Sequence, residues 1–260
     1  MTVILSNKAP YILYELLKFI MPLPKISAPT YELVLPSSGK KVKYRPFLVR
    51  EEKILIMALE SEDTKQITTA IKDVLSTCIL SRGIKIDKLA TFDIEYLFLN
   101  VRAKSVGETV EVNVTCPDDG KTQVQMEIDI DSIKIQRDPE HTNIIKLDDN
   151  LSIQMNYPSL NQFIETNFDT NTDQSQVDQS LEVIMTCIGQ VYNQDEAWEA
   201  SECTKKELKD FVESMNSKQF KEVENFFSTM PKLTHNIKVT NPETKVESTV
   251  VLEGLASFFS

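Results

Sequence analysis

Val110-Glu-Val-Asn-Val-Thr-Cys-Pro-Asp-Asp-Gly-Lys-Thr-Gln-Val-Gln-Met-Glu-Ile-Asp-Ile130 is the stretch that decides the fold of this chain. Apolar residues occupy its even-numbered positions on both sides of a central turn, which predicts two antiparallel strands with one buried face. The turn, Cys-Pro-x-x-Gly-Lys, is the usual first half of a zinc knuckle, in which a second cysteine follows three positions after the first. Asp119 stands there instead, so the sequence predicts the shape of a knuckle with a ligand missing.

A weaker copy of this hairpin lies near the C-terminus, at Ile237-Lys-Val-Thr-Asn-Pro-Glu-Thr-Lys-Val-Glu-Ser-Thr-Val-Val-Leu252. Asn241-Pro242 stands there in the place of Cys116-Pro117. A hairpin that is used twice without its metal ligands indicates a scaffold rather than a catalyst.

Hydrophobic periodicity predicts the other elements. Glu51–Leu59 is expected to form a short helix with Ile54, Met57 and Ala58 on one face, and Thr204 with Glu207 forms a capping box. The further hairpins are expected at 31–44 and 144–157, and the further helices at 64–78 (capped by Asp63 or Thr64), 91–104, 177–192, 204–215 and 217–230, with a short helix after Ser159 containing Phe163 and Ile164, and an exposed loop at 169–175. Hairpins and helices thus follow one another in separate groups along the chain. This order predicts an α+β fold in which antiparallel hairpins, two of them degenerate zinc-ribbon-like, are combined with helical segments.

The expected organisation has three parts: an N-terminal extension at 1–20, an α+β domain at 21–157, and a mainly helical region at 158–260 that ends in a hairpin and a short aromatic tail. The apolar segment Tyr11–Ile20 is interrupted by charges and is too short to span a bilayer. It is a docking helix, a packed core helix, or sequence upstream of a true start at Met21. The last reading is slightly favoured, because the ordered pattern begins at Met21.

The composition of the chain limits the classes of function that it can have. The net charge of −11 argues against a nucleic-acid surface, and its simplest meaning is solubility rather than an acidic docking face. The four cysteines, Cys78, Cys116, Cys187 and Cys203, are far apart in sequence, which favours a reducing compartment and predicts no disulfides. No signal peptide and no membrane-spanning segment are expected.

No constellation of catalytic residues is found. His141 and His235 have no neighbours at metal-ligand spacing, and no glycine-rich phosphate loop or nucleophile elbow occurs. Asp118-Asp119 lacks the spacing of a calcium loop. Cys116 is left as the single, weak candidate for a metal ligand, so we predict no enzyme activity, no cofactor and no complete metal site, with zinc disfavoured.

Two apolar features could bind a partner instead. Trp198, the only tryptophan, lies in an acidic segment, where it either anchors a partner or covers the core from outside. Phe258 and Phe259 form an apolar pair near the end of the chain, which either joins the core or anchors a partner.

Three strings resemble a known family: Tyr44-Arg-Pro-Phe-Leu-Val-Arg-Glu-Glu-Lys-Ile-Leu-Ile-Met-Ala-Leu-Glu60, Phe92-Asp-Ile-Glu-Tyr-Leu-Phe-Leu-Asn-Val-Arg-Ala-Lys-Ser-Val-Gly107 and Val114-Thr-Cys-Pro-Asp-Asp-Gly-Lys121. They are similar to the baseplate hub assembly proteins of T-even-like contractile-tailed bacteriophages (myoviruses). The resemblance is strong over about 21–135 and looser in the helical half. Related sequences often carry complete cysteine pairs in both turns, and this chain departs from them at Asp119 and Asn241.

The resemblance implies a non-enzymatic structural or assembly role at the central hub of the tail baseplate. The implied partners are other hub and tail proteins, with no nucleic acid and no membrane. The implied location is the cytoplasm of the infected bacterium during assembly, and the resemblance leaves open whether the protein remains in the virion tail baseplate or only helps the hub subunits to meet. A second hypothesis is a degenerate zinc-ribbon adaptor that binds host or other phage proteins. A third, a hydrolase using the Asp118-Asp119 pair, is disfavoured.

Overall fold

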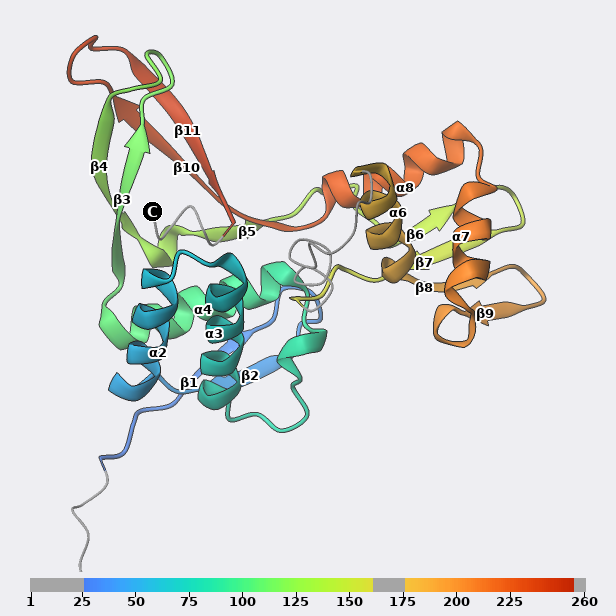
Figure 1. Ribbon diagram of the computed structural model, residues 1–260, viewed down its shortest axis with the longest axis horizontal. Helices are drawn as coiled ribbons and strands as arrows, with labels where there is room; N and C mark the ends of the chain where they lie inside the picture. Colours follow the sequence, from blue (N-terminus) through green and yellow to red (C-terminus); the bar gives the residue numbers. More distant parts are fainter. Residues whose placement is uncertain (1–25, 161–175, 255–260) are drawn as a thin grey trace, which may run out of the picture.

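The computed structural model describes residues 26–160 and 176–254 (Figure 1). Antiparallel sheets and helices alternate along the chain, which confirms the predicted α+β class. The helices are α2 (Val49–Glu60), α3 (Thr64–Cys78), α4 (Thr91–Val106), α6 (Gln176–Cys187), α7 (Lys205–Glu213) and α8 (Ser217–Thr229), with short 3-10 turns η1 (Ile86–Lys88), η2 (Ile130–Ser132) and η3 (Ala200–Glu202). The strands are β1 (Tyr31–Val34), β2 (Lys41–Tyr44), β3 (Thr109–Thr115), β4 (Gln123–Asp129), β5 (Lys134–Gln136), β6 (Ile144–Lys146), β7 (Ser152–Met155), β8 (Ile188–Tyr192), β9 (Ala197–Glu199), β10 (Lys232–Thr240) and β11 (Glu247–Glu253).

The two predicted knuckle hairpins are β3–β4 and β10–β11, and they project together from the helices at the upper left of Figure 1. In β3 the even-numbered side chains are buried and the odd-numbered ones are exposed, as the alternation predicts. Strand β10 also pairs with β5, which makes a three-stranded sheet in the order β11-β10-β5. The buried faces of both hairpins belong to one core cluster, which fixes the hairpins to each other although about 120 residues separate them.

Helix α4 joins this core to a second one. Its residues Leu99 and Ala103 pack with the long hairpins, whereas Leu97 and Val101 pack with α3 and the β1–β2 hairpin. Asp63 caps the start of α3 by accepting hydrogen bonds from two backbone N–H groups, as expected. The central helix therefore carries the hairpins on one side and the N-terminal layer on the other.

A third core lies in the body at the right of Figure 1, where the sheet β6-β7-β8-β9 packs with α6, α7 and α8. The prediction of one helix over 177–192 is wrong at its C-terminal end, because α6 stops at Cys187 and 188–192 forms strand β8. The registers Ile153↔Val191 and Ser152↔Tyr192 explain the difference, since β7 offers β-branched and aromatic residues a strand partner. The capping box of Thr204 and Glu207 is confirmed.

Helix α2 also departs from expectation. Of the three residues placed on one face by the sequence, Ala58 is buried, whereas Ile54 and Met57 are exposed by 47% and 59%. The buried face instead contains Glu51, which is held by Arg45. A charged pair therefore decides which side of this helix faces inward.

Several predictions lie outside the described residues: the extension at 1–20, the start at Met21, the helix after Ser159 with Phe163 and Ile164, the loop at 169–175, and the pair Phe258 and Phe259. The division of the chain at 157/158 stays a prediction. Within 26–160 and 176–254, no helix is long and apolar enough to cross a membrane.

Candidate functional site

The turns of the two long hairpins are bonded to each other at the hairpin tips, and they share one backbone design. In the first turn the N–H of Gly120 donates to the carbonyl of Cys116, and in the second the N–H of Lys245 donates to the carbonyl of Asn241, both at 2.9 Å. Gly120 and Lys245 have nearly equal positive φ angles of 64° and 63°. The second turn is therefore a structural copy of the first, as the repeated sequence pattern indicated.

Asn241 stands at the centre of the contact and is completely buried. Its side-chain Nδ2 donates to both carboxylate oxygens of Asp118 at 3.1 and 3.0 Å, and to Oδ2 of Asp119 at 3.0 Å. Its Oδ1 accepts the backbone N–H groups of Glu243 at 2.8 Å and Thr244 at 3.3 Å. The oxygen of the Asn241 amide thus stabilises its own turn, and the nitrogen binds the opposite turn.

The two carboxylates complete this network. Asp119 accepts the N–H groups of Lys121 at 2.9 Å and Thr122 at 3.0 Å, and the hydroxyl of Thr122 at 2.5 Å. Asp118 accepts the hydroxyl of Thr244 from the second turn. Positions 116, 119, 241 and 244, where a zinc ribbon would carry four cysteines, therefore carry a thiol, a carboxylate, an amide and a hydroxyl.

The donors around these carboxylates favour their charged forms. The hydrogen bonds of Thr122, Lys121 and Asn241 hold the pKa of Asp119 well below its ordinary value of 3.8. Those of Thr244 and Asn241 lower the pKa of Asp118. At neutral pH the junction therefore contains two carboxylates, which neutral donors stabilise.

Cys116 is buried beside this network, and burial together with the charges of Asp118 and Asp119 raises the pKa of its thiol. A cysteine binds zinc as its thiolate, so the raised pKa makes the deprotonation that ligation by Cys116 requires less favourable. In the described part of the chain, no three His, Cys, Asp or Glu side chains are placed to hold a metal ion.

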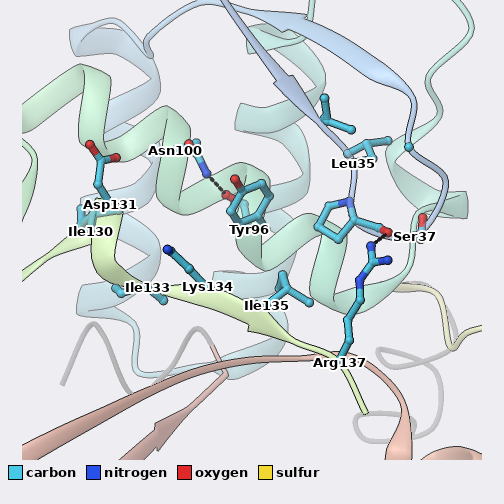
Figure 2. A pocket seen from close by; sticks show the side chains of 13 residues that line it. Leu35, Ser37, Tyr96, Asn100, Ile130, Asp131, Ile133, Lys134, Ile135 and Arg137 are labelled. Atoms are coloured by element: carbon cyan, nitrogen blue, oxygen red, sulfur yellow. Dashed lines mark hydrogen bonds between the residues drawn. The ribbon is translucent and has the colours of Figure 1, made fainter. Parts of the chain in front are cut away.

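A cavity of about 510 Å³ lies beside the base of the hairpins, between the β1–β2 turn, α4 and β5 (Figure 2). Arg137 donates to the carbonyl of Pro36 at its rim. Ser37, also at the rim, binds the buried Asp93 through its N–H and its hydroxyl. Burial raises the pKa of Asp93. The lining contains no histidine or cysteine, and the hydroxyl of its serine, Ser37, donates to the Asp93 carboxylate.

The two histidines lie apart. His141 packs against the ring of Tyr157, with Nδ1 2.9 Å from the Thr229 hydroxyl and Nε2 3.1 Å from the Tyr157 hydroxyl. Burial lowers the pKa of this imidazole. His235 lies on β10, in the other body. The ring contact and the two hydroxyl neighbours of His141 give it a packing role.

Trp198 lies on β9 and is 42% exposed. Its predicted role in partner binding stays a prediction, as does that of Phe258 and Phe259. Asn241 was identified from the sequence as a replaced ligand position, but its hydrogen-bonding role and that of Thr244 were not predicted, although aligning the two turns places both residues at ligand positions.

Comparison with protein families gives one match. The model of the family described as T4 bacteriophage base plate protein matches residues 28–260. Neither a curated protein nor a solved structure matches the chain.

Proposed function

The chain belongs to the T4 bacteriophage base plate protein family, and we propose that it is a non-enzymatic structural or assembly factor of the central baseplate hub. The match over 28–260 carries this proposal, since it covers every described helix and strand. Membership implies interaction with other phage tail proteins and indicates a component of the virion tail. The hub as its place, and binding rather than catalysis as its mode of action, are our inference.

The chemistry of the described residues supports binding over catalysis. At the hairpin tips, the polar groups that could act on a substrate are engaged with one another, with Asn241 joining Asp118 to Asp119. The exposed apolar side chains gather on helix α2 instead, where Ile56 and Met57 face solvent. Apolar groups of this kind are typical of protein interfaces.

Co-expression with the hub, spike and tape-measure proteins of the same phage tests the proposal. We expect a complex that survives purification and contains this chain, and we expect the chain in purified particles if it stays in the finished tail. Trp198→Ala should weaken the complex, whereas Val251→Ala, which shortens an exposed residue of β11, should not. Failure of the chain to bind any of these proteins would contradict the hub role.

The paired turns favour one alternative, a degenerate zinc-ribbon adaptor that binds host or other phage proteins. Their backbone design is repeated, and Cys116 remains at one ligand position. Elemental analysis of purified protein separates the two functions. About one zinc per chain would support the adaptor, and its absence together with binding to hub proteins would support the hub factor.

A further inference from the structure

The cavity at the base of the hairpins is bordered by two strands that do not pair with each other. Residues 34–36, at the end of β1, line one side, and Lys134 and Ile135 of β5 line the other. Within residues 26–160 and 176–254, no ladder joins β1 to β5, and Arg137 crosses the gap between them to bind the Pro36 carbonyl. The two strands therefore leave an open space between them.

The edge of β1 that faces away from β2 has backbone groups to offer. Successive residues of a strand direct their N–H and C=O groups to opposite sides. Lys43 of β2 directs its groups away from β1, because its N–H donates to the Ser81 hydroxyl and its carbonyl accepts the N–H of Leu80, both at 2.8 Å. Its register partner Glu32 therefore points away from β2 as well, and so does Val34, two residues further on. The cavity is lined by β1 and not by β2, so it lies on this side of the strand.

The edge of β5 that faces away from β10 is arranged in the same way. Leu233 of β10 directs its groups toward β11, because its carbonyl accepts the N–H of Gly254 at 3.0 Å. Ile135 is the register partner of Leu233, so the N–H and C=O of Ile135 point away from β10. In the described part of the chain, no other backbone group bonds to those of Ile135 or Val34. The cavity therefore lies along two free strand edges.

The two free edges run in the same direction beside helix α4 (Figure 2). Ser37, which follows β1, lies at the same end of the cavity as Arg137, which follows β5. Tyr96 and Asn100 of α4 line the cavity between the strands. A segment that runs antiparallel to both strands can therefore pair with both at once. The result would be one sheet in the order β2-β1-segment-β5-β10-β11.

The lining indicates which kind of segment fits. Leu35, Ile135 and the ring of Tyr96 favour apolar side chains on the face of the segment that is turned toward α4. Lys134 and Arg137 bring positive charge, and neither forms an ion pair with another described residue. An antiparallel segment begins at the Arg137 end, so an acidic residue near its start would meet the guanidinium.

The part of this chain next to β1 does not suit the place. Residues 20–25 precede β1 and read Ile-Met-Pro-Leu-Pro-Lys. Pro22 and Pro24 have no N–H, whereas a strand between two others needs its N–H groups on both sides. Membership of the baseplate family implies interaction with other phage tail proteins. Together these observations favour a segment from another protein.

We propose that the cavity between β1 and β5 accepts an extended segment of another phage tail protein, which pairs with both strands and carries an acidic residue beside Arg137. The backbone bonds supply the affinity, and the cations Lys134 and Arg137 select the segment. This inference rests on the proposed function, because it assigns the segment to a tail protein.

Removal of one outward N–H tests the pairing with β1. Val34→Pro removes this donor at an exposed position and leaves the bonds to β2 in place, so the fold should be kept. Binding is measured with the purified hub, spike and tape-measure proteins of the same phage. We expect Val34→Pro to weaken it by about tenfold or more, because a carbonyl of the segment loses its donor. Val34→Ala keeps the N–H and should weaken it by less than about threefold.

Val251→Pro is the matched control for the proline. Val251 is also exposed, and it lies three residues before Gly254, which bonds to β10, so its N–H points away from β10. The same change at this free edge should leave the affinity unchanged. Circular dichroism checks that both proline variants fold.

Charge reversal tests the acidic residue of the segment. Arg137→Glu should weaken binding by about tenfold, because two negative charges then face each other. Lys121→Glu makes the same reversal at an exposed position of the hairpin tip and should have no effect.

Amide exchange followed by NMR locates the segment. The N–H groups of Val34 and Ile135 should exchange rapidly in the free chain and should be protected in the complex. Protection of both in the free chain would show that a segment of this chain fills the cavity, and would overturn the proposal.

The results separate this inference from the hub role. Binding that Val34→Pro and Arg137→Glu leave unchanged would overturn the cavity as the site, while the hub role would stand. A chain that binds none of the tail proteins would overturn both.

Discussion

The hairpin tips and helix α2 differ in whether their side chains have partners within the chain. At the tips, Asn241 is fully buried and engages Asp118 and Asp119, so the polar groups have partners within the chain. On α2, Ile56 and Met57 are about half exposed. The tips are closed by contacts between the two turns, whereas the apolar side chains of α2 are exposed among the described residues. The conspicuous sequence motif and the exposed apolar side chains therefore lie in different parts of the molecule.

The anchoring of α2 explains why its apolar side faces outward. Burial alone would raise the pKa of Glu51, but hydrogen bonds from Arg45, Arg50 and Leu48 lower it to about 2. Turning the helix to bury Ile56 would expose this network or leave a buried charge unpaired, which costs several kcal/mol.

The largest expected effect is the restoration of metal binding at the tips. The triple variant Asp119→Cys, Asn241→Cys, Thr244→Cys, together with Cys116, supplies two Cys-x-x-Cys turns that already face each other. We expect it to bind about one zinc per chain and to unfold at a lower temperature once a chelator removes the metal. The control variant, with serine at the same three positions, should bind no zinc. Equal zinc content in both variants would show that the two turns are not aligned as described.

Asn241→Asp tests the hydrogen-bond network that occupies this place in the natural chain. It removes the donor and adds a third carboxylate beside Asp118 and Asp119, so we expect a loss of about 3 kcal/mol in the free energy of unfolding. Asn236→Asp makes the same change at an exposed position on the same strand and should cost under about 0.5 kcal/mol. Similar losses in urea titrations of both variants would contradict a special role for Asn241.

Glu51→Gln should lower the free energy of unfolding by about 2 kcal/mol, because it leaves the largely buried Arg45 guanidinium without its counter-charge. Glu52→Gln, at the next and more exposed position of α2, should change it by less than about 0.5 kcal/mol. Urea titrations at neutral pH measure both. If the two variants behave alike, the ion pair does not orient the helix.

Acid should weaken both regions. The pKa values of Asp118, Asp119 and Glu51 are lower in the folded chain than their ordinary values of 3.8, 3.8 and 4.5. Their stabilisation is therefore complete above the ordinary values and is lost as the pH falls below them. We expect the urea midpoint to fall between about pH 5 and about pH 3, and to fall less in Glu51→Gln. An equal fall of the urea midpoint in Glu51→Gln would show that protonation of Glu51 does not contribute to the loss of stability in acid.

The smallest expected effect is at Lys245. Its φ angle of 63° is unfavourable for a side chain, whereas Gly120 fills the same place in the first turn. Lys245→Gly should stabilise the protein by about 0.5 kcal/mol, part of the gain being offset by the lost bond from Nζ to the Pro242 carbonyl. Thermal unfolding measures the change, and Lys238→Gly, within β10, should destabilise. A destabilised Lys245→Gly would show that the side-chain bond dominates.

Features that depend on local pattern could be predicted from the sequence, whereas features that depend on long-range contacts could not. The alternation from Val110 to Ile130 identified the hairpin and its buried face, because a strand has a period of two. The bond between Asn241 and Asp118 spans 123 positions and has no local signature. The apolar pattern of α2 did not show that Glu51, paired with Arg45, lies on the buried side of the helix. Strand β8 was predicted as helix because its partner strand lies far away in sequence.

Amide hydrogen exchange of the wild type and of Asn241→Asp, measured by mass spectrometry, tests the contrast between the two regions most directly. We expect faster exchange in the turns at 116–122 and 241–246 of the variant, with unchanged exchange in α2. Unchanged exchange of both turns in the variant would contradict a junction held by Asn241.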